Sequence, residues 1–123
     1  MLMFALAAAT APPTPKPTAT PGPQTQRALA DYKAADSAMA NQWRITNAFM
    51  KGKDAQDHRR SHFAYADALL TSQRAWISYR DAACRVEGGV HAGDVRQALI
   101  VAQCKTALTN ARRLQLKGLM ANE

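Results

Sequence analysis

The chain has 123 residues, of which 47% are hydrophobic but only 7% aromatic, and its formal net charge is +7. This length predicts one small domain with a thin core of helix-forming residues, and it excludes an assembly of several large domains. The charge favours polyanions in general and does not choose among nucleic acid, anionic lipid and acidic envelope polymers.

Residues 1–11 form an uninterrupted run of apolar and small side chains. The run is too short to span a bilayer but is typical of the hydrophobic region of a signal peptide. Because no Lys or Arg precedes it, we expect a truncated or poor signal peptide, with Ala7-Ala8-Ala9 as the better cleavage site. No cysteine follows that could carry a lipid anchor. We therefore expect an exported protein, periplasmic or secreted.

Residues 12–23 contain all six prolines of the chain, together with Thr, Ala, Lys and Gly. This composition favours a disordered, extended linker. No proline occurs in residues 24–123 and glycines are few there, so long helices are permitted. The sequence therefore predicts an all-α domain over residues 24–123, an antiparallel bundle of about three helices.

Apolar side chains at spacings of three and four predict helices over residues 25–51, from about residue 61 to 87, and over 94–117. The predicted apolar stripes are Leu29, Tyr32, Met39, Trp43 and Met50 in the first helix, Phe63, Ala66, Leu70, Ile77 and Cys84 in the second, and Leu99, Ala102, Leu108, Ala111 and Leu114 in the third. Asp94 and Gln97 resemble a capping box at the start of the third helix. Residues 52–61 are crowded with polar side chains and could form a loop or continue a helix. An antiparallel pairing of Asp36 with Arg80 favours a loop, with Ser61 capping the second helix.

The only two cysteines, Cys84 and Cys104, follow the expected signal peptide, a context in which two thiols predict a disulfide. Closing a loop of about 20 residues contributes ~3 kcal/mol in the chain-entropy account. Cys84 lies near the end of the second predicted helix and Cys104 well inside the third, an offset of roughly 10 Å along the helix axis. We therefore expect the intervening loop to project past the end of the bundle. Its members form the candidate contact loop: Gly88, Gly89, Val90, His91 and Gly93.

The most specific sequence motif in the chain is Gln73-x-x-Trp76-x-x-x-Arg80-Asp81-x-x-Cys84. It is followed by Cys104 with Leu108-Thr109 and Arg112. Over residues 26–116 the chain resembles the lysozyme-inhibitor LprI-type domain, a group of small exported bacterial proteins. Family members often carry a further cysteine pair near the first helix, which this chain lacks. The residues that carry the resemblance, and that we expect to be structural, are Asp36, Gln73, Trp76, Arg80, Asp81, Leu108, Thr109 and Arg112.

Gln73 and Arg80 fall on the apolar stripe of the second helix, where an unpaired polar group would be costly. Asp36, on the first helix, is the expected counter-ion of Arg80. A ligand site formed by Arg80, Asp81 and Arg112 is the functional alternative. Trp43 and Trp76 are expected to lie in the core.

Asp54, His58 and His62 would share one face of a helix and could then bind zinc or copper, but the expected loop removes that alignment. Arg59-Arg60 and Arg112-Arg113 could contact phosphates, yet the chain contains no recognised nucleic-acid-binding module and export removes the usual partner. We therefore expect no metal, no cofactor and no nucleic-acid partner. No nucleophile, phosphate-binding loop or carboxylate pair predicts an enzyme.

These features predict a non-enzymatic exported binding protein. The family resemblance implies lysozyme or another envelope protein as partner, with inhibition by occlusion of the lysozyme cleft. Since many lysozymes are strongly basic, a chain of net charge +7 would meet repulsion at long range. The alternative is a basic cell-envelope module that binds anionic glycan, lipid or peptidoglycan.

Overall fold

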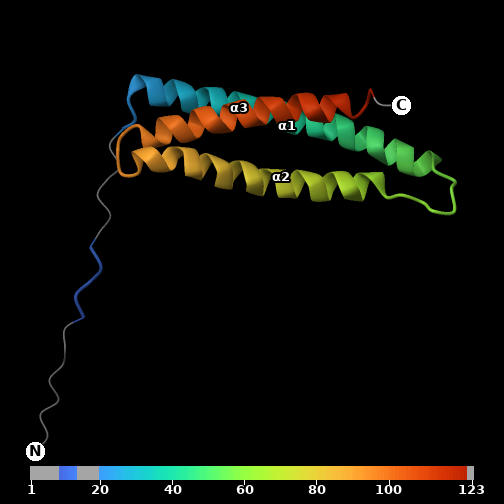
Figure 1. Cartoon of the computed structure of the whole chain (residues 1–123), viewed down its shortest axis with the longest axis horizontal. Coiled ribbons are helices and arrows are strands. Elements are labelled where there is room, and N and C mark those ends of the chain that lie inside the picture. The colour runs from blue at the N-terminus through green and yellow to red at the C-terminus, as the bar shows by residue number, and fades with distance from the viewer. Residues whose placement is uncertain (1–8, 14–19, 122–123) are drawn as a thin grey trace, which may run out of the picture.

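The computed structural model describes residues 9–13 and 20–121, and within them it contains three long helices and no strand. Helix α1 (Pro23–Gln56) and helix α2 (Tyr65–Gly88) run in opposite directions, and helix α3 (Gln97–Gly118) runs parallel to α1 (Figure 1). The predicted all-α bundle is confirmed. Most of the predicted signal peptide and linker lies outside the described residues. No described helix is both long and apolar enough to cross a bilayer.

Helix α1 is longer than predicted. It begins at Pro23, where the fixed φ of proline suits a first helical turn. It then continues through Gly52 to Gln56, so the loop between α1 and α2 is 57–64 and not 52–61. The reason for the longer helix lies at its end, where the carboxylate of Asp54 accepts hydrogen bonds from the backbone N–H groups of Tyr65 (2.7 Å) and Ala66 (3.1 Å).

These bonds satisfy two of the backbone donors that a helix start leaves unpaired. The prediction that Ser61 caps α2 is therefore wrong. The carboxylate of Asp54, in the preceding helix, caps the start of α2 instead.

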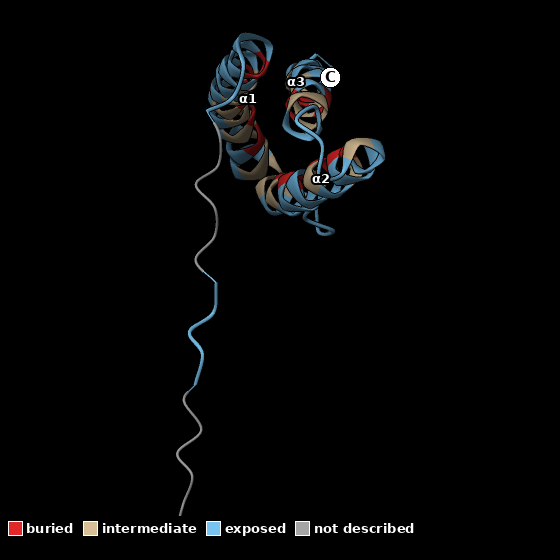
Figure 2. Ribbon diagram, turned by 90° about the vertical axis from the view of Figure 1, so that its left-hand side faces the viewer, coloured by how far each residue is buried: buried red, intermediate tan, exposed pale blue. Residues whose placement is uncertain are grey.

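The interior changes character along the bundle. At the end nearer the 57–64 loop, Met39, Met50, Leu69 and Leu116 form an apolar core, against which Trp43 and Trp76 also pack. At the other end the buried side chains are small: Ala28, Ala35, Cys84, Ala102 and Cys104. Figure 2 shows the buried residues on the faces that the three helices turn toward one another.

The predicted disulfide between Cys84 and Cys104 is confirmed, with Cα atoms 5.5 Å apart. Helix α2 does not stop at Glu87. Gly88 and Gly89 keep right-handed helical angles, and the path continues through the short 3₁₀ helix η1 (Gly89–His91). Helix α3 starts at Gln97, three residues later than predicted.

As a result, Cys84 lies seven residues before the end of η1, and Cys104 lies seven residues after the start of α3. The predicted offset between the two cysteines is therefore absent. The reason to expect a projecting connector disappears with it.

The apolar stripes were predicted less accurately than the helices. Ile77 and Leu114 are exposed, and Phe63 precedes α2 and is half exposed. The buried line of α2 is instead Leu69, Gln73, Arg80 and Cys84, and that of α3 is Ala102, Cys104, Thr109, Arg112 and Leu116. Gln73 and Arg80, the polar residues that interrupt the predicted apolar stripe of the second helix, thus lie in the interfaces between the helices.

Candidate functional site

Arg80 lies in the middle of the bundle and is 6% exposed. Its guanidinium donates to the carboxylate of Asp36 on α1 (3.2 Å), to that of Asp81 on its own helix (3.0 Å) and to the hydroxyl of Thr109 on α3 (3.4 Å). One arginine therefore contacts all three helices. The expected pairing of Arg80 with Asp36 is present in the structure.

Arg112 of α3 is equally buried but has a different set of partners. It donates to the side-chain oxygens of Gln73 (3.0 Å), Gln115 (2.6 Å) and Ser72 (2.8 Å), all of them neutral. Burial without a carboxylate partner lowers the pKa of Arg112. The positive charge of Arg112 is thus stabilised by the dipoles of neutral side chains and not by an ion pair.

The indole of Trp76 lies near both arginines. The guanidinium carbon of Arg80 lies 5.3 Å from the centre of a Trp76 ring and 5.3 Å from that of Tyr32, while Arg112 lies 5.9 Å from Trp76. Cations at these distances are attracted by the negative face of an aromatic ring. Burial opposes the charge of Arg80, but its hydrogen bond to Asp81 and the neighbouring charges outweigh this effect and raise the pKa of Arg80.

We call this group the central polar layer: Tyr32, Asp36, Gln73, Trp76, Arg80, Asp81, Thr109 and Arg112. Its donors point to neighbouring helices, so the geometry favours the structural interpretation over a ligand site. The remaining motif residue, Leu108, lies partly buried on α3. The sequence did not indicate the contributions of Ser72 and Gln115, because nothing in their own surroundings marks them as partners of Arg112.

The connector, residues 89–96, lies at the disulfide end of the bundle beside the start of α1 (Figure 1). It lines an open groove of about 850 Å³ together with residues 20–25. The predicted capping box is wrong, because α3 has Arg96 at its N-cap position and no side-chain capping bond. Asp94 and Gln97 instead stabilise the turn before the helix: Asp94 accepts from the backbone N–H of Arg96 (2.9 Å), and the side chain of Gln97 accepts from that of Gly93 (3.2 Å). Gly93 has a φ of 79°, which favours glycine.

Within the predicted contact loop, Gly88 is buried and Val90 is strongly exposed. His91 lies 3.7 Å from the carboxylate of Asp94. The exposed large hydrophobic side chains of this end are Val86, Val90 and Val95, and charged residues of both signs are exposed with them.

The loop between α1 and α2, residues 57–64, forms the opposite end of the molecule; we call it the basic loop. Asp57 organises it. Its carboxylate accepts from the backbone N–H of Arg59 (3.1 Å), from the Arg59 guanidinium (2.8 Å twice) and from the backbone N–H of Phe63 (3.3 Å). These hydrogen bonds from Arg59 hold the pKa of Asp57 well below its usual range. Asp57 was not singled out in the sequence, although an aspartate at the end of a helix is typical of such turns.

The structure separates the three residues considered for a metal. Asp54 lies in α1 and bonds the start of α2, whereas His58 and His62 lie in the basic loop. The Nδ1 atom of His62 is 3.3 Å from the backbone oxygen of Asp57. In the part of the chain that the structure describes, no three His, Cys, Asp or Glu side chains come together as metal ligands.

The model of the LprI lysozyme inhibitor family matches residues 16–116, which include α1, α2, all but the last two residues of α3, and both cysteines. The chain belongs to the LprI family. A relative from Rhizobium meliloti (strain 1021), named an uncharacterised protein, is 35% identical over 92 residues, covering 73% of this chain and 66% of the relative. The chain thus spans just under two thirds of that relative's length. No solved structure matches the chain significantly.

The LprI match begins ten residues before the resemblance seen in the motifs and ends at the same residue, 116. It therefore covers both ends of the bundle as well as the central polar layer. Within the layer Gln73, Arg80, Thr109 and Arg112 are buried, while the side chains of Asp36 and Asp81 are about half exposed. The two ends differ in chemistry: the connector end exposes three valines among charges of both signs, whereas the basic loop exposes two arginines and buries its one carboxylate.

Proposed function

We propose that the protein is a non-enzymatic exported binding protein that inhibits a lysozyme. The observation that carries this proposal is the match to the lysozyme inhibitor family over residues 16–116. The disulfide supports export, because such bonds persist in oxidising compartments.

Inhibition by occlusion needs a rigid surface and no chemistry of its own. The bundle supplies rigidity through the disulfide at one end, the central polar layer in the middle and the capped α1–α2 junction at the other end. A rigid surface loses little conformational freedom on binding, which favours affinity.

The test is a lysozyme turnover assay on a cell-wall suspension with the purified protein over a range of salt concentrations. We expect inhibition at micromolar protein. If the lysozyme is basic, inhibition should strengthen from low to moderate salt, because salt screens the repulsion by this chain's charge of +7. Unchanged turnover at micromolar protein in moderate salt would contradict the proposal.

The second candidate function is a cell-envelope module that binds anionic glycan, lipid or peptidoglycan. The exposed basic side chains favour it, since they occur along the whole bundle: Arg27, Lys33, Arg44, Lys51, Arg60, Arg74, Arg85, Arg96 and Lys117. This function predicts binding to such polymers that weakens steadily with added salt. Sedimentation with purified peptidoglycan at low and moderate salt, alongside the turnover assay, distinguishes the two candidates because the salt dependences have opposite signs.

A further inference from the structure

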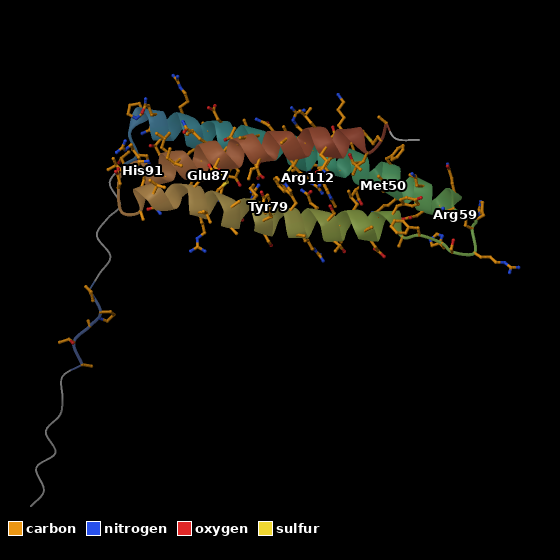
Figure 3. All side chains as sticks on the ribbon, viewed as in Figure 1. Met50, Arg59, Tyr79, Glu87, His91 and Arg112 are labelled. Atoms are coloured by element: carbon orange, nitrogen blue, oxygen red, sulfur yellow. A yellow bond between two sulfur atoms is a disulfide. The ribbon has the colours of Figure 1, made fainter. Side chains whose placement is uncertain are left out.

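The basic loop, residues 57–64, extends beyond the end of α3 (Figure 1). Figure 3 shows Arg59 at this tip, at the opposite end of the bundle from His91. The tip is narrow because only the end of α1, the loop and the start of α2 form it. A narrow projection can enter a cleft, whereas the long sides of the bundle cannot.

Within the loop the one acidic side chain is turned inward and the arginines outward, while the exposed Asp67 lies beyond the loop, in the first turn of α2. The side chain of Asp57 is 5% exposed, while that of Arg59, its partner, is 59% exposed. Asp54 is engaged by the backbone of α2. The carboxylates therefore hold the loop in place and leave a cationic surface facing solvent.

Arg60 is the side chain at this tip that is available to pair with a partner. It is exposed, and none of the described residues forms a hydrogen bond or ion pair with it. The planar guanidinium carries five donors in a fork that matches carboxylates. Because Asp57 already pairs with Arg59, no neighbouring carboxylate in the loop neutralises Arg60.

Phe63 provides an apolar contact beside these cations. Half of its surface is exposed, and its ring packs edge-to-face on Tyr65 at 4.8 Å. Tyr65 in turn lies under the ammonium of Lys53 at 4.4 Å and next to the guanidinium of Arg59. An aromatic ring that packs on Tyr65, in the same short loop as an unpaired arginine, gives this loop the composition of a binding hot spot.

We propose that the basic loop enters a carboxylate-lined cleft of a protein, with Arg60 pairing to the carboxylates and Phe63 packing against the cleft wall. This inference rests on the proposed function and assigns the active-site cleft of the lysozyme as the occupied surface. Glycoside hydrolases place two carboxyl groups on either side of the scissile bond. A basic lysozyme that repels the body of this protein therefore still attracts a cationic tip at that position.

The opposite end fits such a cleft less well. Its most exposed large hydrophobic side chains are Val86, Val90 and Val95, and Arg96 there is paired with Asp94. Contact through that end would bury valines, and the charges that accompany them are of both signs, since Arg85 and Arg96 are exposed together with Glu87 and Asp94. The charge distribution thus favours the basic loop.

The experiment measures inhibition constants of the full chain and of four variants in the lysozyme assay at moderate salt. Arg60→Ala and Phe63→Ala change the basic loop. Arg85→Ala and Val90→Ala are the matched controls near the connector, where both residues are also exposed. We expect the inhibition constant to rise about tenfold or more for each loop variant and less than about twofold for each control.

The mode of inhibition supplies a second readout. A loop in the cleft competes with substrate, so the apparent KM should rise while kcat stays unchanged. Circular dichroism and the urea midpoint of each variant verify that all four exposed substitutions leave the bundle folded.

Each outcome decides a specific claim. Wild-type protein that leaves turnover unchanged overturns the proposed function and the inference together. Inhibition that survives both loop substitutions overturns the inference alone. Equal weakening by Arg60→Ala and Arg85→Ala overturns it in favour of binding to a polyanion through general charge.

Discussion

The two halves of the bundle are stabilised by different means. Between the central polar layer and the basic loop, the core consists of large apolar side chains around Met50, Leu69 and Leu116. Between the layer and the connector it consists of alanines and the disulfide. Small side chains let helices approach closely, which a disulfide requires, but they bury little apolar surface. The covalent bond thus stabilises the half in which burial contributes least.

The largest expected effect comes from the apolar half. Leu116 is fully buried, so Leu116→Ala should lower the free energy of unfolding by about 2–5 kcal/mol through lost burial and a residual cavity. Leu114→Ala on the same helix is the control, because Leu114 is 58% exposed. Urea unfolding of both variants measures the difference. Similar losses in the two variants would contradict the packing described here.

The next effect comes from the other half. Replacing both cysteines by alanine should lower the free energy of unfolding by about 3 kcal/mol, because the disulfide closes a loop with a sequence separation of 20. Adding reductant to the wild-type protein should reproduce this loss, and reductant should leave the double variant unchanged. A reductant effect well below 1 kcal/mol would show that the small-residue half holds together without its crosslink.

A smaller effect is expected at two neighbouring glycines, Gly88 and Gly89, which should respond differently to replacement by alanine. A Cβ atom added at Gly88 would lie 2.5 Å from Cγ2 of Val101 on α3, whereas one added at Gly89 meets nothing within 4 Å. Gly88→Ala should therefore destabilise the protein by about 1–3 kcal/mol through overpacking. Gly89→Ala should be neutral or stabilising by up to about 1 kcal/mol, since alanine favours its helical angles. Equal effects of the two substitutions would mean that α2 and α3 do not approach this closely.

The sequence could predict the features that depend on local patterns, but not those that depend on contacts between helices. Helix number and the disulfide follow from local patterns, and they are confirmed. The buried line of each helix does not follow, because Gln73, Arg80 and Arg112 look like interruptions until their partners are known. Each partner lies on another helix or is a residue that no sequence pattern distinguishes. Buried polar residues are satisfied by tertiary contacts, which periodicity does not contain.

The helix ends show the same limit. Gly52 and Gly88 were expected to mark helix ends, yet both lie in helices. The carboxylate of Asp54 ties the end of α1 to the start of α2, and a close helix contact fits the lack of a side chain at Gly88. A glycine permits a turn, but the contacts around it decide whether the turn occurs there.

The smallest expected effect concerns the basic loop and depends on pH. Because hydrogen bonds from Arg59 lower the pKa of Asp57 in the folded protein, the charged form of Asp57 stabilises the loop above its ordinary pKa of 3.8. This contribution should be lost progressively as the pH falls below that value. In Asp57→Asn it is absent at every pH, so the stability difference between wild type and variant should be largest near pH 7 and shrink toward pH 2. Urea unfolding at several pH values measures the difference, and hydrogen exchange at the Phe63 amide, which donates to Asp57, locates it. A difference that stays constant with pH would show that the charge of Asp57 does not organise the loop, and the cationic tip would then lack the rigid base from which it is proposed to bind.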